Sequence, residues 1–555
     1  MTAAPSNTEG YRGGPPDSPD RNLVDDHSHN HGHNDGQHVT GTELHPHPHH
    51  QAQPQRRFSR ASSRRASVVS PVNYNVPDDY ANLEASNISP VQNPDEEPIT
   101  RHETLEQVRS RDRDYIREQK QQRRESQLRH VDHQQQPQAA ESSEDYDREK
   151  GQQQTGIAKS HKVSRLATEL YTVSYLILFS LLGTLARLGL QALTSNYPQS
   201  PIIFPSIWPN FAGCVVMGFL AEDRMLFRSD WGQDPAPSKK SDDQETGSVP
   251  VEPKIDPATT KKAHLALKKT IPLYIGLATG FCGSFTSFSS FIRDIFLALS
   301  NDLSASSSPD TPTMHSRNGG YSFMAILSVL ITTISLSLSG LSLGAHLAIA
   351  IAPLFLRFNL TLPYGFTSKV LDRLAVLLGF GCWLGSVFLS IWPPDRYSLS
   401  ILNDSVNEKW RGTATFALVF APLGCLLRFY TSAHLNGRLP NFPLGTFVVN
   451  MLGTAVLGMA WDLEHVSLPG GGVVGCQVLQ GVADGFCGCL TTVSTWAVEL
   501  AALRRRNAYV YGGARCGWGV GVVGGDNGEF EVDEGVWGGQ VCSLMTRSYV
   551  VVPGK

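Results

Sequence analysis

The sequence predicts an all-α polytopic membrane protein in which two inverted four-helix repeats are joined by one linking transmembrane helix, behind a disordered N-terminal leader. Three observations predict this class. A polar leader precedes a series of long apolar segments, one pattern of small and polar residues occurs twice in the same order, and basic residues alternate between the loops. The mean hydropathy of -0.18 hides this division, because it averages the leader with the apolar remainder.

Residues 1–165 are expected to form a disordered cytoplasmic leader. They are rich in His, Gln, Ser, Arg and Asp and poor in branched aliphatic residues, so burial cannot offset the entropy lost on ordering. The net charge of -4 and the lack of a basic patch interleaved with aromatics argue against a nucleic-acid partner. The nine cysteines are scattered and do not resemble a disulfide framework.

About 20 apolar residues are needed to cross a bilayer, and about nine segments approach this length. They are 171–194, 203–223, 271–300, 322–350, 372–392, 412–433, 443–461, 472–503 and the weak, Gly-rich 507–525. Because four spans return the chain to its starting side, the lone span at 372–392 inserts the second group of four upside down. The expected product is an inverted pair of repeats.

The domain boundaries follow from these spans. The first repeat is expected at 166–350 and carries a charged cytoplasmic insertion at 229–262. A linker at 351–411 holds the connecting helix, and the second, inverted repeat covers 412–525. Residues 526–555 form a divergent tail.

Loop charges predict the orientation, since short cytoplasmic loops carry the excess of Lys and Arg. Lys159, Lys162 and Arg165 precede the first span, whereas the loop at 195–202 has no basic residue. The N-terminus is therefore expected in the cytoplasm.

The repeated pattern lies inside the apolar halves. The first copy runs Gly183, Arg187, Asn210, Gly213, Gly218 and then Gly280 to Phe291, read as GFCGSFTSFSSF. The second copy runs Gly424, Arg428, Asn450, Gly453, Gly458 and then Gly485 to Trp496, read as GFCGCLTTVSTW. Gly and small hydroxyl residues disfavour a continuous helix, so each third span is expected to break. Duplicated membrane units place their function at the interface between the copies.

These motifs resemble the CrcB/Fluc-type fluoride channels, and the order of four, one and four spans resembles the fused two-domain fungal fluoride export proteins. The resemblance covers roughly residues 166–510. It implies an antiparallel pseudo-dimer within one chain, fluoride paths at the interface of the halves, and a structural sodium ion at its centre. By resemblance, backbone carbonyls of Gly283, Thr286, Gly488 and Thr491 would hold this Na⁺.

Asn210 and Asn450 are candidate path residues, because an amide inside an apolar span must face protein or a polar route. Asn, Ser and Thr offer donors that can replace the water around a small anion without a trapping charge, and Thr492 and Ser494 belong to the same set. Interhelical hydrogen bonding is the alternative role for these amides.

Phe288 and Phe291 share a helical face, and their ring edges carry partial positive charge that can contact an anion. Ordinary core packing is the alternative. The second copy has Val493 and Trp496 at these positions, which predicts two unequal paths. Hydroxyl residues at steps of three and four in the fourth span predict a polar stripe: Ser328, Thr332, Ser335, Ser339 and Ser342.

Arg187 and Arg428 lie toward the ends of their spans, where snorkelling to the headgroups and a structural or vestibule role are equally weighted. The favoured function is a passive fluoride-exporting channel of the plasma membrane, not an enzyme. Two alternatives are a coupled small-substrate transporter, which would need a membrane-buried carboxylate, and a non-transporting membrane scaffold.

Overall fold

The computed structural model describes residues 74–83, 104–135, 164–195, 202, 204–227, 264, 266–300, 303, 319–358, 360–392, 414–465 and 472–528. Within these ranges all regular secondary structure is helical, as the sequence predicts. The insertion at 229–262 and nearly all of the tail at 526–555 lie outside the described residues.

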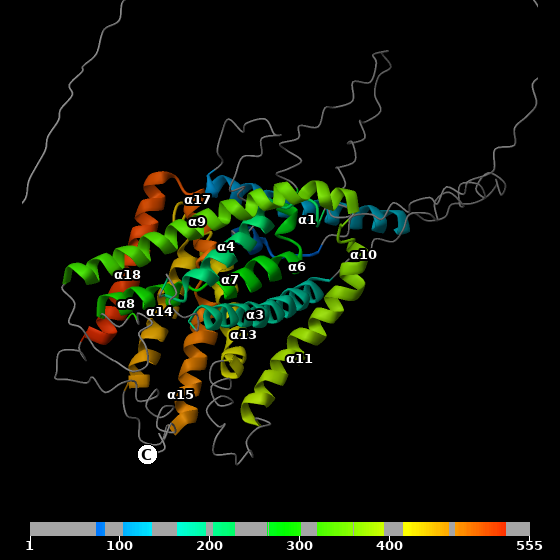
Figure 1. Ribbon diagram of the computed structural model, residues 1–555. Helices are drawn as coiled ribbons and strands as arrows, with labels where there is room; N and C mark the ends of the chain where they lie inside the picture. The colour runs from blue at the N-terminus through cyan, green and yellow to red at the C-terminus, as the bar shows by residue number, and fades with distance from the viewer. Residues whose placement is uncertain are drawn as a thin grey trace, which may run out of the picture. The chain divides into compact units, whose positions relative to one another are not determined.

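The first repeat contains two continuous helices, an interrupted segment and a long final helix (Figure 1). The interrupted segment has three short pieces in direct succession, one of them a π-helix, and continues as a longer helix after two non-helical residues. The elements are α3 (Arg165–Ser195), α4 (Ile207–Glu222), α6 (Pro272–Ile275), η2 (Gly276–Cys282), α7 (Gly283–Phe285), α8 (Phe288–Ser300) and α9 (Gly319–Phe358).

A link and a second repeat of the same order follow. The link consists of α10 (Tyr364–Phe366), η3 (Thr367–Leu371) and α11 (Asp372–Ile391). The second repeat consists of α13 (Phe416–Leu435), α14 (Leu444–His465), α15 (Gly472–Gly481), η5 (Val482–Cys487), α16 (Gly488–Leu490), α17 (Ser494–Ala502) and α18 (Arg505–Gly528). Each of the nine expected spans therefore corresponds to a helix or an interrupted helical segment.

Six of these helical stretches are long and apolar enough to cross a membrane. They are Arg165–Thr194, Pro272–Ser300, Gly319–Phe358, Tyr364–Ile391, Phe416–Leu435 and Leu444–Glu464. The apolar helix α4 has only 16 residues. The chain is a multi-pass membrane protein.

Both interrupted segments break at the predicted place. In each repeat a π-helix leads into a three-residue helix. The next residue is extended, with φ -94° and ψ 146° at Thr286 and φ -93° and ψ 155° at Thr491. A break at membrane depth needs partners for its exposed backbone groups, and the halves supply these to each other.

Glycine permits the close packing of α4 on α9. A Cβ atom at Gly218 would overlap the carbonyl oxygen of Leu341, and one at Gly344 would overlap that of Val215. Small residues at such crossings let helix backbones approach closely, which holds the second and fourth helices of the first repeat together.

Two parts of the leader are ordered, which corrects the expectation of disorder for them. Residues Asp78–Asn82 form a 3-10 helix, and α1 spans Leu105–Gln135. Tyr74, Tyr80 and Leu105 are buried. The physical reason is that apolar residues at helical spacing in α1, and aromatic residues before it, give the leader a buried face. The rest of residues 1–163 lies outside the described residues.

The ordered leader is attached to the helical body by buried polar contacts. Tyr74 donates a hydrogen bond to Asp372 at 2.8 Å, and Asn82 donates to the carbonyl oxygen of Ala433 at 2.8 Å. Asp112 of α1 forms an ion pair with Lys269 at 3.0 Å, with both side chains buried. These contacts join the leader to the first repeat, to the link and to the second repeat.

Candidate functional site

The two broken segments cross and satisfy each other's backbone. The hydroxyl oxygen of Thr491 accepts hydrogen bonds from the backbone N–H of Phe288 and of Ser289, at 3.1 and 3.0 Å. The hydroxyl oxygen of Thr286 accepts in the same way from Val493 and Ser494, at 3.2 and 3.1 Å. Each Thr therefore caps the helix that follows the other repeat's break, and the two breaks form one site.

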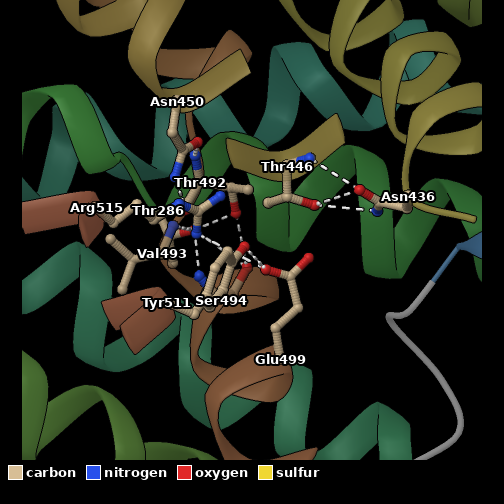
Figure 2. A network of polar contacts seen from close by, with 10 residues as sticks. All are labelled: Thr286, Asn436, Thr446, Asn450, Thr492, Val493, Ser494, Glu499, Tyr511 and Arg515. Atoms are coloured by element: carbon tan, nitrogen blue, oxygen red, sulfur yellow. Dashed lines mark hydrogen bonds and ion pairs between the residues drawn. The ribbon is translucent and has the colours of Figure 1, made fainter. Parts of the chain in front are cut away.

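Further hydroxyl groups extend this crossing network (Figure 2). The Thr286 hydroxyl oxygen lies 3.1 Å from the hydroxyl oxygen of Thr492 and 3.1 Å from that of Ser494. Ser494 donates in turn to the carbonyl oxygen of Cys282, at 3.2 Å. Thr492 and Ser494, two predicted site residues, thus lie where the two breaks meet.

The first repeat contributes an equivalent residue that the sequence reasoning missed. Ser289 donates to the carbonyl oxygen of Cys487 at 3.3 Å, which mirrors the contact between Ser494 and Cys282. Ser289 stands three residues after Thr286, as Ser494 stands three after Thr491. Aligning the two copies residue by residue would have identified it.

Asn210 and Asn450 hold the residue that follows each Thr. The side-chain oxygen of Asn210 accepts from the Ser287 N–H at 2.9 Å, and its amide donates to the Ser287 carbonyl oxygen at 3.4 Å. Asn450 makes the same pair of bonds with Thr492, both at 3.0 Å (Figure 2). Each Asn amide group carries two N–H donors, and the bond to the carbonyl oxygen uses one of them. The second N–H is the donor that each Asn can offer to an anion.

Arg187 and Arg428 are buried, with 1% and 2% of their surfaces exposed, so snorkelling is wrong for both. Arg187 of α3 donates to the carbonyl oxygen of Asp484 in the other repeat, and its guanidinium occupies the space where Gly488 lacks a side chain. Arg428 donates to the carbonyl oxygen of Cys489 at 2.8 Å and packs in the same way against Gly283. Two arginines therefore reach across the breaks and fix them.

The aromatic residues that follow the two breaks form one buried cluster. The Phe288 and Phe291 rings meet edge to face, with centroids 5.7 Å apart. Trp496 of the second repeat contacts both, at 5.4 Å from Phe288 and 6.4 Å from Phe291. All three are almost fully buried.

The helices that follow the two breaks pack against different helices of the opposite repeat. We call the packing of α17 on α4 and α9 the α17 interface, and the packing of α8 on α14 and α18 the α8 interface. Phe288 therefore borders α18, where it lies beside Gly519. The hydroxyl-bearing helix α9 packs against α8 of its own repeat and also against α17, which follows the break with Val493 and Trp496.

The predicted hydroxyl stripe is not the inward face of α9. Ser328, Ser335 and Ser339 are exposed, whereas Thr333 and Ser337 are buried on that helix. Thr332 and Ser342 donate back to carbonyl oxygens of their own helix, at 2.5 Å to Ser328 and 3.3 Å to Leu338, as hydroxyls in membrane helices often do.

The correction has a geometric cause. Residues at steps of three and four do share one face of the helix. Ser and Thr occur on both faces of α9, however, and the sequence pattern picked the exposed face. Within the described part of the chain, the hydroxyl groups of Thr333 and Ser337 have no hydrogen-bond partner. Buried polar groups of this kind need water or a ligand.

Two buried carboxylates occupy equivalent positions after the breaks. Asp294 of α8 and Glu499 of α17 stand eight residues after Thr286 and Thr491, and their exposures are 1% and 0%. Asp294 was missed in the sequence reasoning, although its place eight residues after Thr286 matches that of Glu499. Burial of charge at these points marks them as functional candidates.

Comparisons with known proteins agree with this geometry. The family model described as CrcB-like protein, Camphor Resistance (CrcB) matches residues 174–344 and 415–525, one match for each repeat. The chain belongs to the CrcB family. Its alignment to fluoride export protein 1 of Neurospora crassa is 71% identical and covers 94% of this chain and 96% of that protein.

More distant CrcB relatives match as well. Fluoride export protein 1 of Candida albicans is 34% identical over 60% of this chain and 72% of its own length. The fluoride-specific ion channel FluC of Pseudomonas paraeruginosa is 32% identical over 20% of this chain and 80% of its own length, as expected of a protein the size of one repeat. No solved structure matches.

Proposed function

We propose that this chain is a fluoride-selective channel that exports the anion from the cytoplasm by passive electrodiffusion. The observation that carries the proposal is the mutual capping of the two breaks by Thr286 and Thr491. It places hydroxyl, amide and N–H groups of both repeats at the centre of the membrane-embedded body, where the relatives' names specify fluoride export and fluoride-specific conduction.

The chemistry of this site suits a small, strongly hydrated anion. Donors from Asn, Ser and Thr can replace hydration water without binding the ion so tightly that it cannot leave. A membrane potential that is negative inside drives each anion outward with about 2.3 kcal/mol per 100 mV. We place the protein in the plasma membrane with its N-terminus in the cytoplasm, acting as a single-chain pseudo-dimer.

The carbonyl groups of the broken segments also suit a structural sodium ion. The short helices α7 and α16 contact each other and end at extended residues. Carbonyls at a helix C-terminus lack intrahelical partners and carry partial negative charge. The ion would be held by backbone oxygens of Gly283, Thr286, Gly488 and Thr491, which are not the carbonyls that Arg187 and Arg428 occupy.

Efflux from liposomes tests the function directly. Purified full-length chain should release trapped fluoride when a potential is imposed, and it should not release chloride under the same conditions. Absence of selective fluoride flux at confirmed orientation and incorporation would overturn the proposal.

The two interfaces can be separated in the same assay. We expect Asn210→Ala and Asn450→Ala to differ strongly in severity, because the α17 interface joins Asn210 to the buried hydroxyls of α9 while the α8 interface joins Asn450 to the Gly-rich α18. Equal and mild losses of fluoride flux in both variants at matched incorporation would contradict unequal conduction through the two interfaces.

A further inference from the structure

The two interfaces differ in the polar groups that they bury. The α17 interface includes α9, which buries the neutral hydroxyls of Thr333 and Ser337. The α8 interface includes α18 in its place, and this helix has no Ser or Thr between residues 507 and 525. It buries the side chain of Arg515 instead. One interface therefore contains neutral hydroxyls, and the other contains a cation.

The guanidinium group of Arg515 lies among three aromatic rings. Its central carbon is 4.8 Å from the ring centroid of Tyr511, 5.5 Å from that of Phe288 and 5.9 Å from that of Trp496. Phe288 begins α8 after the first break, and Trp496 lies in the first turn of α17 after the second break. The cation therefore lies beside both breaks, where the two repeats meet.

The arrangement of these rings suits a cation and not an anion. A guanidinium group interacts with the electron-rich face of an aromatic ring, whereas an anion contacts the electron-poor edge. Phe288 is one of the residues that the sequence predicted to contact fluoride, and Arg515 lies over its ring. In the α8 interface this ring therefore stabilises a resident positive charge.

A carboxylate holds the guanidinium group in place. One nitrogen of Arg515 forms an ion pair with Glu499 at 3.7 Å, and Tyr511 donates a hydrogen bond to the same carboxylate oxygen (Figure 2). Arg515 and Glu499 are both completely buried. Separating a buried ion pair is costly, so Arg515 stays between Glu499 and the rings.

Arg515 does not brace the backbone as the other two buried arginines of the repeats do. Arg187 and Arg428 donate to backbone carbonyl oxygens at the breaks. Within the described part of the chain, none of the three nitrogens of Arg515 makes a hydrogen bond, and neither does the indole nitrogen of Trp496 beside it. Buried donors without acceptors bind an anion tightly at low dielectric. An anion that reached this point would be retained and not passed on.

We propose that Arg515 closes the α8 interface to fluoride, so that conduction takes place through the α17 interface. This inference rests on the proposed fluoride function and assigns a residue to the difference between the two paths. The side chain fills the space between the rings, and its charge holds an anion too tightly for release. The Glu499 carboxylate also repels an anion from the same point. The neutral hydroxyls of α9 have none of these effects.

A gain of flux tests the proposal. Arg515→Ser replaces the cation by a small neutral hydroxyl donor, and Glu499→Gln in the same chain avoids an unpaired buried carboxylate. In liposomes at matched incorporation, this double variant should roughly double the fluoride efflux of the wild type, because two paths with neutral donors would conduct in parallel. Removal of a purely structural arginine would instead leave the efflux unchanged or lower it.

The same change should have a larger effect in a chain whose α17 interface is disabled. Thr333→Val with Ser337→Ala should leave little efflux, and adding Arg515→Ser with Glu499→Gln should restore it. Adding Arg515→Lys, which keeps a cation at this point, should restore nothing. Arg515→Gln with Glu499→Gln retains more of the side chain's volume, and it should restore part of the efflux if melting shows that the Ser variant is unfolded.

Arg506→Ser is the matched control, because it removes an exposed charge from the first turn of the same helix. It should leave fluoride efflux unchanged. An equal gain in Arg506→Ser and in the Arg515→Ser double variant would overturn the proposal, since the gain would then follow net charge alone.

The remaining outcomes separate closure by Arg515 from the channel itself. A wild type that conducts fluoride, together with folded neutral variants of Arg515 that add no flux in either background, would overturn the closure and leave the channel intact. Fluoride efflux that appears only when the cation is removed would support the closure. Absence of fluoride efflux from the wild type and from both neutral variants would overturn the channel and the closure together.

Discussion

At the scale of single residues, Thr286 and Thr491 connect the two repeats at their broken helices. Each accepts two backbone N–H groups from the opposite repeat and donates to a carbonyl of its own segment, at 3.0 Å to Cys282 and 2.9 Å to Cys487. A single hydroxyl therefore replaces the backbone partners that a continuous helix would have provided.

Replacing Thr286 by Val tests this role, because Val preserves shape and removes the acceptor. Two buried N–H groups, of Val493 and Ser494, would lose their partner, and each unsatisfied group costs about 1–3 kcal/mol. We expect a clear drop in melting temperature. Thr332→Val is the matched control, since Thr332 bonds only within its own helix; a similar drop in both variants would contradict the capping role.

Lys268 predicts a specific pH dependence of stability. It is buried, it donates to carbonyl oxygens of Leu220 and Asp223, and burial lowers its pKa from 10.5 to about 8. Between pH 8 and 10.5 the unfolded chain keeps a proton that the folded chain has lost, so this group makes stability rise with pH in that window. Below pH 8 both states are protonated and the slope vanishes.

The measurement compares wild type with Lys268→Met, so that other titrating groups cancel. The difference in unfolding free energy between the two proteins should change between pH 8 and 10.5 in favour of the wild type. A constant difference across that range would show that Lys268 titrates normally.

At the scale of elements, the sequence predicted which helices form and in what order better than it predicted which face of each helix is buried. All nine spans were predicted because long apolar runs and repeated Gly patterns are local signals, and both breaks were predicted because Gly and hydroxyl residues weaken a helix locally. The family and the candidate Asn and Thr positions followed from the motifs.

Features that depend on tertiary contacts were not predictable in this way. The inward face of α9 depends on which helices cover it, and hydroxyl residues occur on both faces. Arg187 is buried because the opposite repeat provides a carbonyl oxygen, and Arg428 because its guanidinium packs against Gly283 of the opposite repeat while it binds a carbonyl oxygen of its own repeat. The order in α1 was overlooked because its composition is charged, although Thr104 and Gln107 form a capping box.

The corrected face of α9 makes a prediction about transport. We expect Thr333→Val together with Ser337→Ala to reduce fluoride efflux substantially, because these buried hydroxyls face the protein interior. Ser335→Ala together with Ser339→Ala, on the exposed face, should leave efflux nearly unchanged. Liposome flux at matched incorporation decides, and the opposite ranking would restore the exposed stripe as the polar route.

At the scale of the whole molecule, the ordered leader contacts three positions that the proposed orientation puts on one side of the membrane. Tyr74, Asn82 and Asp112 contact the start of α11, the end of α13 and the residue Lys269. With the N-terminus inside and nine crossings, all three of these positions fall on the cytoplasmic side.

Tags on intact cells test that orientation. A tag after Lys555 should be accessible to external protease, whereas one inserted at Lys240 should be protected. Protection of both tags would mean that α18 does not cross the bilayer, and digestion of the Lys240 tag would reverse the whole topology.

The reciprocal caps also bear on how such a chain could have arisen and what it can no longer do. An ancestral repeat that paired with its own copy would obtain its caps from an identical partner. Here Thr491 caps the start of α8 and Thr286 caps the start of α17, while the residues around them have diverged. Each half now receives from the other the hydroxyl acceptor that its broken helix needs, so a gene carrying one half would encode a fold that lacks these caps until it meets a partner.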